Sequence, residues 1–160
     1  MDTKTLLQNF KSIYPENHHE ARVYFSPGRV NLIGEHTDYN GGYVFPCALS
    51  FGTYLVMAPN DTDKVRFATG NFDVRHEQNV NSLNRKIDQM WINYPMGVMH
   101  EFVTRGFSIP GMDLFFYGNV PNGAGLSSSA SIEVVTATAL NDFLHAGISG
   151  VEIALLCQHA

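Results

Sequence analysis

The chain has 160 residues and a mass of 17.8 kDa, a common size for one domain with a single hydrophobic core. Hydrophobic residues make up 44% of the sequence and charged residues only 16%, which excludes a disordered tail and a coiled coil. Because the formal net charge is −5, the chain lacks the excess of basic residues with which proteins bind nucleic-acid backbones. We therefore expect a well-folded protein with no nucleic-acid partner.

Leader, membrane and cysteine patterns point to the cytoplasm. No segment reaches the ~18 uncharged apolar residues of a membrane-spanning helix, and the N-terminus has no basic leader followed by an apolar stretch. Cys47 and Cys157 are far apart and have no metal-ligand spacing, so they are predicted to be reduced thiols. We expect a cytoplasmic protein with no membrane partner.

The first two thirds of the chain predict one helix followed by strands. Leu6, Phe10 and Ile13 recur at helical spacing, and the pattern stops at Pro15. Five short runs rich in β-branched and aromatic residues, each bounded by turn residues, predict strands at 22–25, 30–33, 53–57, 65–68 and 114–117.

A helix is predicted from Ser129 onward. Its apolar positions recur at helical intervals, at Ile132, Val135, Ala139 and Phe143. Gly147 stands where a helix C-cap is expected.

A second helix is predicted to follow at once, because Ser149 and Glu152 form a capping-box pattern. Its apolar face is expected to carry Val151, Leu155 and Leu156, and the pattern still runs at Ala160. The class is mixed α and β, and a chain that stops within a helix suggests part of a larger domain.

The segment from Gly123 to Ser129 has the features of a phosphate-binding loop. It follows a predicted strand and leads into the Ser129 helix. Glycines let the backbone approach an anion, and a helix N-terminus adds partial positive charge. The three hydroxyls suit an N-cap, a bond to phosphate oxygens or a magnesium ligand. The alternative is a Gly/Ser turn that only caps a buried helix.

Three other loop types do not fit this segment. A Walker loop requires a Lys where Leu126 stands, and a dinucleotide fingerprint requires a Gly where Ser128 stands. A nucleophile elbow lacks its trailing Gly.

A second polar segment, at 27–42, places Arg29, Glu35, His36 and Asp38 among apolar residues and turn glycines. Such a dense set of donors and acceptors suits sugar hydroxyls. The alternatives are a metal site, for which no HExxH pattern exists, and a surface turn in which Arg29 pairs with a carboxylate.

Trp91 and Tyr94 are three residues apart and so would share one helix face. Such a pair is either core packing or a platform on which a base stacks.

These segments resemble one enzyme family. GRVNLIGEHTDY at 28–39 resembles the galactokinase signature, and VPNGAGLSSSASIEV at 120–134 resembles the ATP-binding motif of the GHMP family of small-molecule kinases. WINYPMGV at 91–98 resembles the galactokinase segment whose aromatic residues flank adenine. The first motif is highly specific, whereas the second is shared with homoserine and mevalonate kinases. The sequence is thus similar to the galactokinase branch of the family.

The resemblance implies transfer of the γ-phosphoryl group of ATP to the anomeric hydroxyl of α-D-galactose, giving galactose 1-phosphate, with Mg²⁺ bound. Arg29 would stabilise the transition state near the attacking hydroxyl. The residues implied to contact the sugar are Arg29, Glu35, His36, Thr37 and Asp38. Those implied to bind the nucleotide are Thr69, Trp91, Tyr94, Gly123, Ala124, Gly125, Leu126, Ser127, Ser128 and Ser129, and Ser129 would also reach magnesium.

The same resemblance implies an α+β fold over 1–160, the N-terminal domain of the GHMP kinase fold, with a mixed sheet packed against helices and a left-handed βαβ crossover. It puts the family's catalytic Asp, a magnesium-binding Glu and a sugar-contacting Tyr beyond residue 160. We therefore expect an incomplete N-terminal domain, a C-terminal domain absent from this chain, an active site in the cleft between the two, and little kinase activity in this chain alone.

Two other functions stay open. A regulatory protein on the same scaffold would bind galactose and ATP without turnover, and an N-acetylgalactosamine kinase would need extra room at C2 of the sugar. Arg29 and Ser129 favour an enzyme, because a module that only binds has no need of a transition-state cation.

Overall fold

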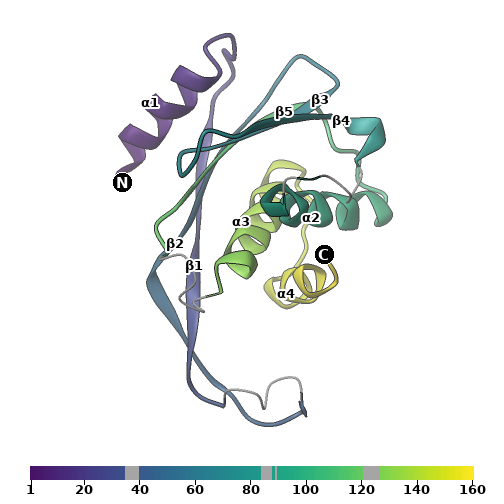
Figure 1. Ribbon diagram of the computed structural model, residues 1–160. Helices are drawn as coiled ribbons and strands as arrows, with labels where there is room; N and C mark the ends of the chain where they lie inside the picture. Colours follow the sequence, from purple (N-terminus) through teal and green to yellow (C-terminus); the bar gives the residue numbers. More distant parts are fainter. Residues whose placement is uncertain (35–39, 84–87, 89, 121–126) are drawn as a thin grey trace.

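A mixed sheet with helices on both faces forms the structure (Figure 1), a computed structural model that describes residues 1–34, 40–83, 88, 90–120 and 127–160. The helices and strands are α1 (Thr3–Ile13), β1 (Arg22–Ile33), β2 (Phe45–Pro59), β3 (Lys64–Thr69), β4 (Arg75–Asn79), the 3₁₀ turns η2 (Val80–Ser82) and η3 (Met90–Ile92), α2 (Asn93–Thr104), β5 (Met112–Gly118), α3 (Ser128–Phe143) and α4 (Gly150–His159). The predicted α+β class is confirmed.

The five strands of the described part lie in the order β1-β2-β5-β3-β4. β3 and β5 are parallel, and the other neighbouring pairs are antiparallel. The connection from β3 to β5 runs through β4 and α2, which is the crossover that the resemblance implies. Its left-handed sense stays a prediction.

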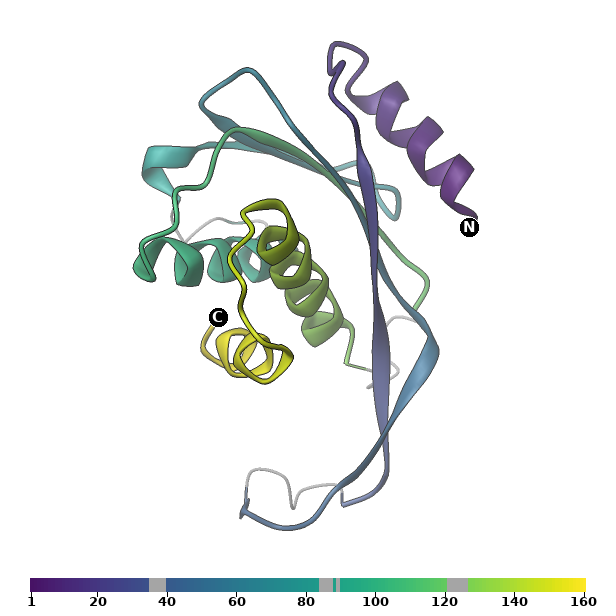
Figure 2. The ribbon, with the colours of Figure 1, turned by 180° about the vertical axis from the view of Figure 1, so that it is seen from behind.

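Buried apolar side chains form two clusters, one on each face of the sheet. The larger joins the sheet to α2, α3 and α4, and the smaller lies beneath α1. The view from behind shows α1 on the opposite side of the sheet from the other three helices (Figure 2). The expectation of a single core is therefore wrong, because helices cover both faces of this sheet.

The strands at 22–25 and 30–33 are two parts of one long strand, β1. Its pairing with β2 shifts register between Pro27 and Arg29 and again between Asn31 and Ile33, which interrupts the strand pattern locally. The sequence analysis missed β4, whose residues RHEQN are polar and lie at the sheet edge.

Helix α3 ends earlier than expected. Leu144 is its C-cap, and His145, with φ 50°, takes the left-handed position that usually favours glycine. The amide of Ala146 donates to Asn141 O at 3.0 Å and that of His145 to Asp142 O at 3.3 Å, the pattern of a Schellman motif. Gly147 also has a positive φ of 68° but lies in the connection beyond the cap.

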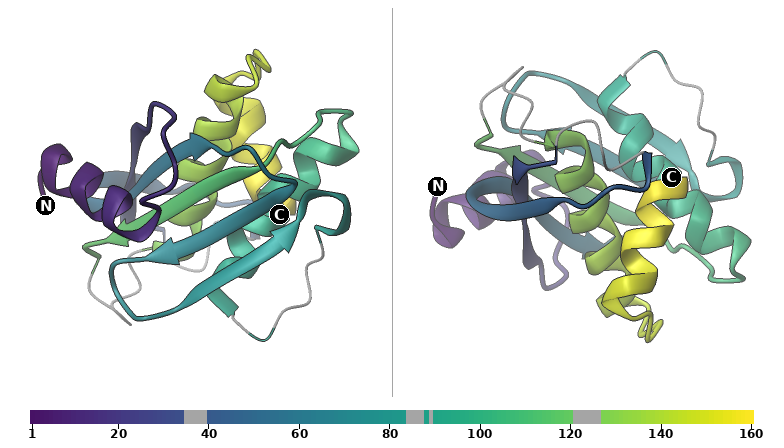
Figure 3. Two further views of the ribbon diagram at one scale, coloured as in Figure 1. Left: turned by 90° about the horizontal axis from the view of Figure 1, so that it is seen from above. Right: turned by 90° about the horizontal axis from the view of Figure 1, so that it is seen from below.

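The capping box of α4 is confirmed: Ser149 caps the helix, and Glu152 bonds back to the N-cap amide. Its predicted apolar face is wrong in part, since Val151 is 73% exposed and Leu155 51% exposed. Leu156 is buried as predicted, and Ile153 and Cys157 are buried in place of the other two, because that side of α4 packs on α3 and α2. The view from below shows α3 and α4 side by side (Figure 3).

Two further expectations concern the cysteines and the membrane. Cys47 and Cys157 are both free thiols, as predicted. Among the described residues, no helix is both long and apolar enough to cross a bilayer.

Candidate functional site

Seven of the predicted site residues lie in the described part of the chain: Arg29, Thr69, Trp91, Tyr94, Ser127, Ser128 and Ser129. Eight others, Glu35, His36, Thr37, Asp38, Gly123, Ala124, Gly125 and Leu126, lie outside the described residues.

A cavity of about 250 Å³ brings five of the seven together. Thr69 is the last residue of β3, Trp91 lies in η3, Tyr94 lies in the first turn of α2, and Ser128 and Ser129 begin α3. These residues come from four separate elements, and β5, which lies next to β3 in the sheet, adds Phe116 and Gly118 to the lining. The predicted nucleotide-binding residues of the described part, Ser127 apart, thus share one site.

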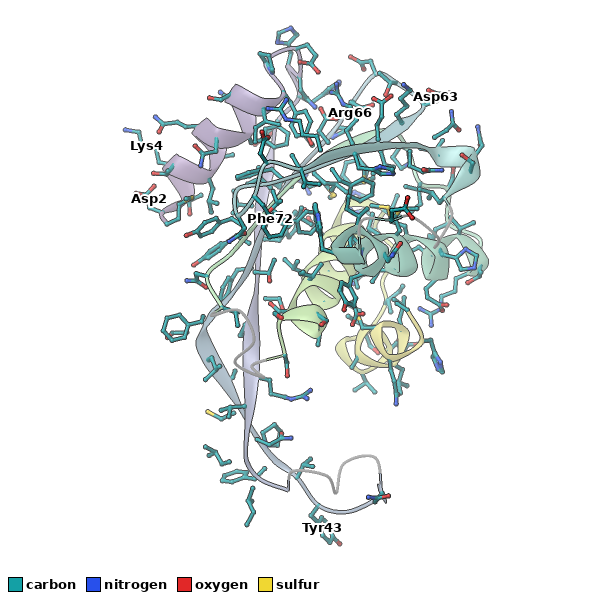
Figure 4. All side chains as sticks on the ribbon, in the orientation of Figure 1. Asp2, Lys4, Tyr43, Asp63, Arg66 and Phe72 are labelled. Carbon is teal, nitrogen blue, oxygen red and sulfur yellow. The ribbon has the colours of Figure 1, made fainter. Side chains whose placement is uncertain are left out.

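The wall formed by Trp91 is aromatic. Its ring packs edge-on against Phe72, at 6.2 Å between centroids, and against Phe116, at 5.6 Å. Phe72 lies in the connection after β3, where its side chain is labelled in Figure 4. Trp91 packs against the larger core cluster and also lines the cavity, so the packing role and the platform role belong to one side chain.

Two asparagines that sequence analysis missed hold the strands near the cavity, and one of them, Asn71, lines it. Asn71 Nδ2 donates to Gly118 O at 2.8 Å, and Gly118 N donates to Asn71 Oδ1 at 2.8 Å, so the side chain extends the pairing of β3 with β5. Asn119 follows β5, and its Oδ1 accepts from the amide of Gly52 on β2 at 2.8 Å. The signal available in the sequence is the Thr-Gly-Asn turn at 69–71, in which Thr69 Oγ1 accepts from the Asn71 amide at 3.2 Å.

A second cavity, of about 400 Å³, holds Arg29 together with Ser127 and Cys47. Arg29 is exposed and is the first residue of β1 to pair with β2 after the register shift. Within the described ranges it makes no ion pair. Glu35 and Asp38, the carboxylates of the same motif, lie outside the described residues, so the surface-turn alternative stays open.

The first turn of α3 separates the two cavities. Ser127 occupies the N-cap in a left-handed conformation, with φ 57° and ψ 42°, and its side chain makes no capping bond. The first amides of this 16-residue helix thus have no side-chain cap, and the helix dipole favours an anion at this point. Non-glycine residues in the left-handed region often mark functional sites, because the strain persists only where the surroundings impose it.

For a metal ion the described residues offer little. They contain no group of three or more His, Cys, Asp or Glu side chains that could hold one. Ser129 presents one hard hydroxyl oxygen beside the helix N-terminus. A magnesium ion here would need the nucleotide phosphates as its main ligands.

Comparisons with known proteins match both halves of the chain. A family model described as the galactokinase galactose-binding signature matches residues 8–59, and one for the GHMP kinases N terminal domain matches residues 93–160. The galactokinase of Bacillus subtilis is 46% identical over 154 residues, covering 94% of this chain and 39% of that protein. The galactokinase of Clostridium acetobutylicum is 49% identical over 164 residues, covering 100% of this chain and 42% of that protein.

Solved structures agree with these matches. A Lactococcus lactis galactokinase complexed with galactose superposes with a TM-score of 0.90 at 35% identity, over 97% of this chain and 40% of that one. The Methanococcus jannaschii mevalonate kinase, at 21% identity and a TM-score of 0.74, shares the fold. The chain spans about two fifths of the length of the relatives it matches, between 39% and 42% in the two galactokinases above. The chain is thus similar to the N-terminal part of galactokinases, and its C-terminal segment matches the N-terminal domain of the GHMP kinases.

Proposed function

We propose that this chain supplies the nucleotide-binding and part of the sugar-binding machinery of a galactokinase, which transfers the γ-phosphoryl group of ATP to the anomeric hydroxyl of α-D-galactose. One observation carries the proposal. Five of the predicted nucleotide residues share one cavity and Arg29 lines the next, with the first turn of α3 between them. Phosphoryl transfer needs this arrangement, because its catalysis consists mainly of positioning and charge neutralisation.

In this proposal each cavity has its own task. Trp91 and Tyr94 border the adenine, the Ser127–Ser129 turn binds phosphate oxygens through its amides and hydroxyls, and Thr69 contributes a further hydroxyl. Magnesium, when bound with the nucleotide, neutralises charge on the phosphates, and Ser129 is the residue that would hold it. Arg29 would stabilise the negative charge that develops on the transferring group.

The sugar would lie beside Arg29. Glu35, His36, Thr37 and Asp38, which belong to the motif at 28–39, are proposed as its further contacts on the sequence resemblance. The similar Lactococcus lactis galactokinase was solved as a complex with galactose, which supports this choice of sugar.

We also propose that residues 1–160 form an N-terminal domain that works with a second domain carrying the catalytic base. The shares of 39% and 42% that the chain covers in its relatives support this. So does the uncovered apolar surface of the β1–β2 hairpin, which projects beyond the helices (Figure 1). On this proposal the 160-residue chain has little or no turnover by itself, and a cytoplasmic location stays a prediction.

The experiment measures galactose-dependent ADP formation by the full-length protein and by the 160-residue chain, each with its intact mass determined. Turnover by the first and not by the second is expected. Normal turnover by the 160-residue chain would contradict the two-domain proposal. If the full-length protein binds galactose and ATP but releases no ADP, the result would favour a regulatory binding protein over an enzyme.

A matched pair of arginine variants tests the assigned role. Arg29→Ala is expected to lower kcat about a thousandfold, the scale of a lost transition-state cation. Arg75→Ala removes an exposed arginine on β4 that lines neither cavity, so kcat should stay near the wild-type value. If the two changes lower kcat by the same factor, Arg29 has no specific role in the transfer step.

A further inference from the structure

A buried hydroxyl on α3 links the two strands that carry the site. The amide of Thr53 on β2 donates to Ser131 Oγ at 3.0 Å, and Ser131 Oγ donates to the carbonyl oxygen of Ser26 on β1 at 2.8 Å. Ser26 and Thr53 are register partners in the antiparallel pair. The hydroxyl of Ser131 thus relays a hydrogen bond between two paired residues, and it joins the helix to both strands at once.

This relay lies in the wall between the two cavities. Thr53 lines the cavity of Trp91, whereas Ser26 and Ser131 line the cavity of Arg29. One further pair, Pro27 with Gly52, follows before the strands shift register between Pro27 and Arg29. Ser131 therefore fixes the ladder one pair before the register shift, close to the segment that carries Arg29.

The helix turn beside the relay divides its residues between the cavities. Ser128 and Ser129 face the nucleotide cavity, whereas Ser127 and Ser131 line the cavity of Arg29. A shift of this turn relative to the strands would move the phosphate-binding groups relative to Arg29. Such a shift would remove no side chain from the lining of either cavity, so each cavity would keep the groups that bind its own ligand.

We propose that Ser131 is a positioning residue for phosphoryl transfer, which sets the α3 turn in register with β1 and so aligns the nucleotide cavity with Arg29. This role rests on the proposed galactokinase function and extends it to a side chain that need not touch either substrate. Because in-line transfer depends steeply on alignment, losing the hydroxyl should slow the chemical step more than it weakens the binding of either substrate.

The test compares two variants of the full-length protein that each remove one buried hydroxyl from α3. Ser131→Ala removes the relay, whereas Thr136→Val removes a hydroxyl that donates only to the helix carbonyl of Ile132, at 2.7 Å. For Ser131→Ala, kcat is expected to fall about tenfold to a hundredfold, with the KM of galactose and of ATP each within about twofold of wild type. For Thr136→Val, both constants should stay near wild type.

The outcomes separate the two proposals. If the wild-type protein is active, three results overturn the positioning role alone. The Ser131→Ala variant keeps the wild-type kcat, or its kcat falls only together with a rise in KM, or Thr136→Val lowers kcat by the same factor. A wild-type protein that forms no ADP with galactose overturns the proposed function and this role with it. Should Ser131→Ala fail to fold, Ser131→Cys fills the same space with a weaker hydrogen-bonding thiol. A reduced kcat at unchanged KM is then the supporting result, and a wild-type kcat is the contrary one.

Discussion

At the scale of single residues, the close approach of β1 to β2 near Ser26 requires a glycine at position 52. A Cβ at Gly52 would lie 2.0 Å from the carbonyl oxygen of Ser26 and 2.8 Å from the Cα of Pro27, both of them backbone atoms. On its other side Gly52 is held by Asn119, whose side chain accepts from the Gly52 amide at 2.8 Å and whose amide donates to the Gly52 carbonyl at 3.1 Å. The strand cannot move aside in either direction without breaking these contacts.

Gly52→Ala is therefore expected to lower the free energy of unfolding by about 3 kcal/mol, the cost of forcing a methyl group into a closely packed site. Urea unfolding followed by circular dichroism measures it. Gly150→Ala is the matched control, because no atom lies within 4 Å of a Cβ placed there. The control should change stability by less than about 1 kcal/mol, and a similar loss in both variants would show that the contact around Gly52 is not the cause.

At the scale of elements, α3 is attached to β1 at both ends. Near its start, Ser131 bonds to Ser26, and at its end Asp142 accepts from Arg22 Nη1 at 2.9 Å and from the hydroxyl of Tyr24 at 2.7 Å. Two attachments fix both the position and the direction of the helix on the sheet. The direction matters because the first turn of α3 forms the wall between the cavities.

The attachment at Asp142 makes stability depend on pH in the acid range. The Tyr24 hydroxyl bond and then the Arg22 bond hold the pKa of Asp142 below its usual value of 3.8. The folded protein thus binds this proton less readily than the unfolded chain, so the contribution is present above pH 3.8 and is lost as the pH falls further. Asp142→Asn should flatten the acid part of the stability profile. Asp73→Asn, which changes an exposed aspartate outside this network, is the control.

The same attachment makes stability fall with rising pH in the alkaline range, the opposite of its effect in acid. Burial, and then the bond to Asp142, raise the pKa of Tyr24 from 10.0 to about 12. The contribution is therefore present below pH 10.0 and is lost as the pH rises toward about 12. Urea unfolding at stepped pH values measures both limbs, and an acid limb unchanged by Asp142→Asn would contradict the assignment.

The sequence predicts an element well where one side of it differs clearly from the other. The amphipathic spacing of α1 and the Ser149 capping box follow local rules, and the structure confirms both. Helix α4 is apolar on most sides, so spacing alone favours Val151 and Leu155, whereas α2 and α3 bury Ile153 and Cys157. Strand β4 is polar and forms by pairing with β3, which no pattern within its five residues indicates.

The site shows the same division. Motifs identify Trp91, Ser129 and Arg29 one by one, since each lies in a segment with its own composition. The groups that position them act over long sequence distances: Asn71 bonds to a residue 47 positions away and Ser131 to one 105 positions away. Such contacts depend on the order of strands in the sheet, and the spacing of residues within one segment does not predict that order.

At the scale of the whole molecule, the β1–β2 hairpin departs most from an ordinary globular surface. Leu32 is 63% exposed and Ile33 71% exposed, and because successive strand residues point to opposite faces, both faces of the hairpin are uncovered there. Phe45 pairs with Ile33 across the hairpin and is also exposed. Tyr43, labelled in Figure 4, is 100% exposed. A patch of this kind in a soluble protein marks a surface that binds something or self-associates.

The 160-residue chain alone should therefore self-associate through the hairpin. Replacing Leu32, Ile33 and Phe45 together by threonine is expected to lower the apparent mass in sedimentation and the fluorescence of a bound hydrophobic dye. Threonine suits a strand, so the free energy of unfolding should change by less than about 1 kcal/mol.

Val103→Thr is the control for the hairpin variant, because Val103 is an exposed apolar residue of α2. It should leave both readouts near those of the unmodified chain. If the hairpin variant associates as strongly as the unmodified chain, or if Val103→Thr lowers association as much, the hairpin is not the associating surface. The exposed residues of α4, Val151 and Leu155, would then be the next to change.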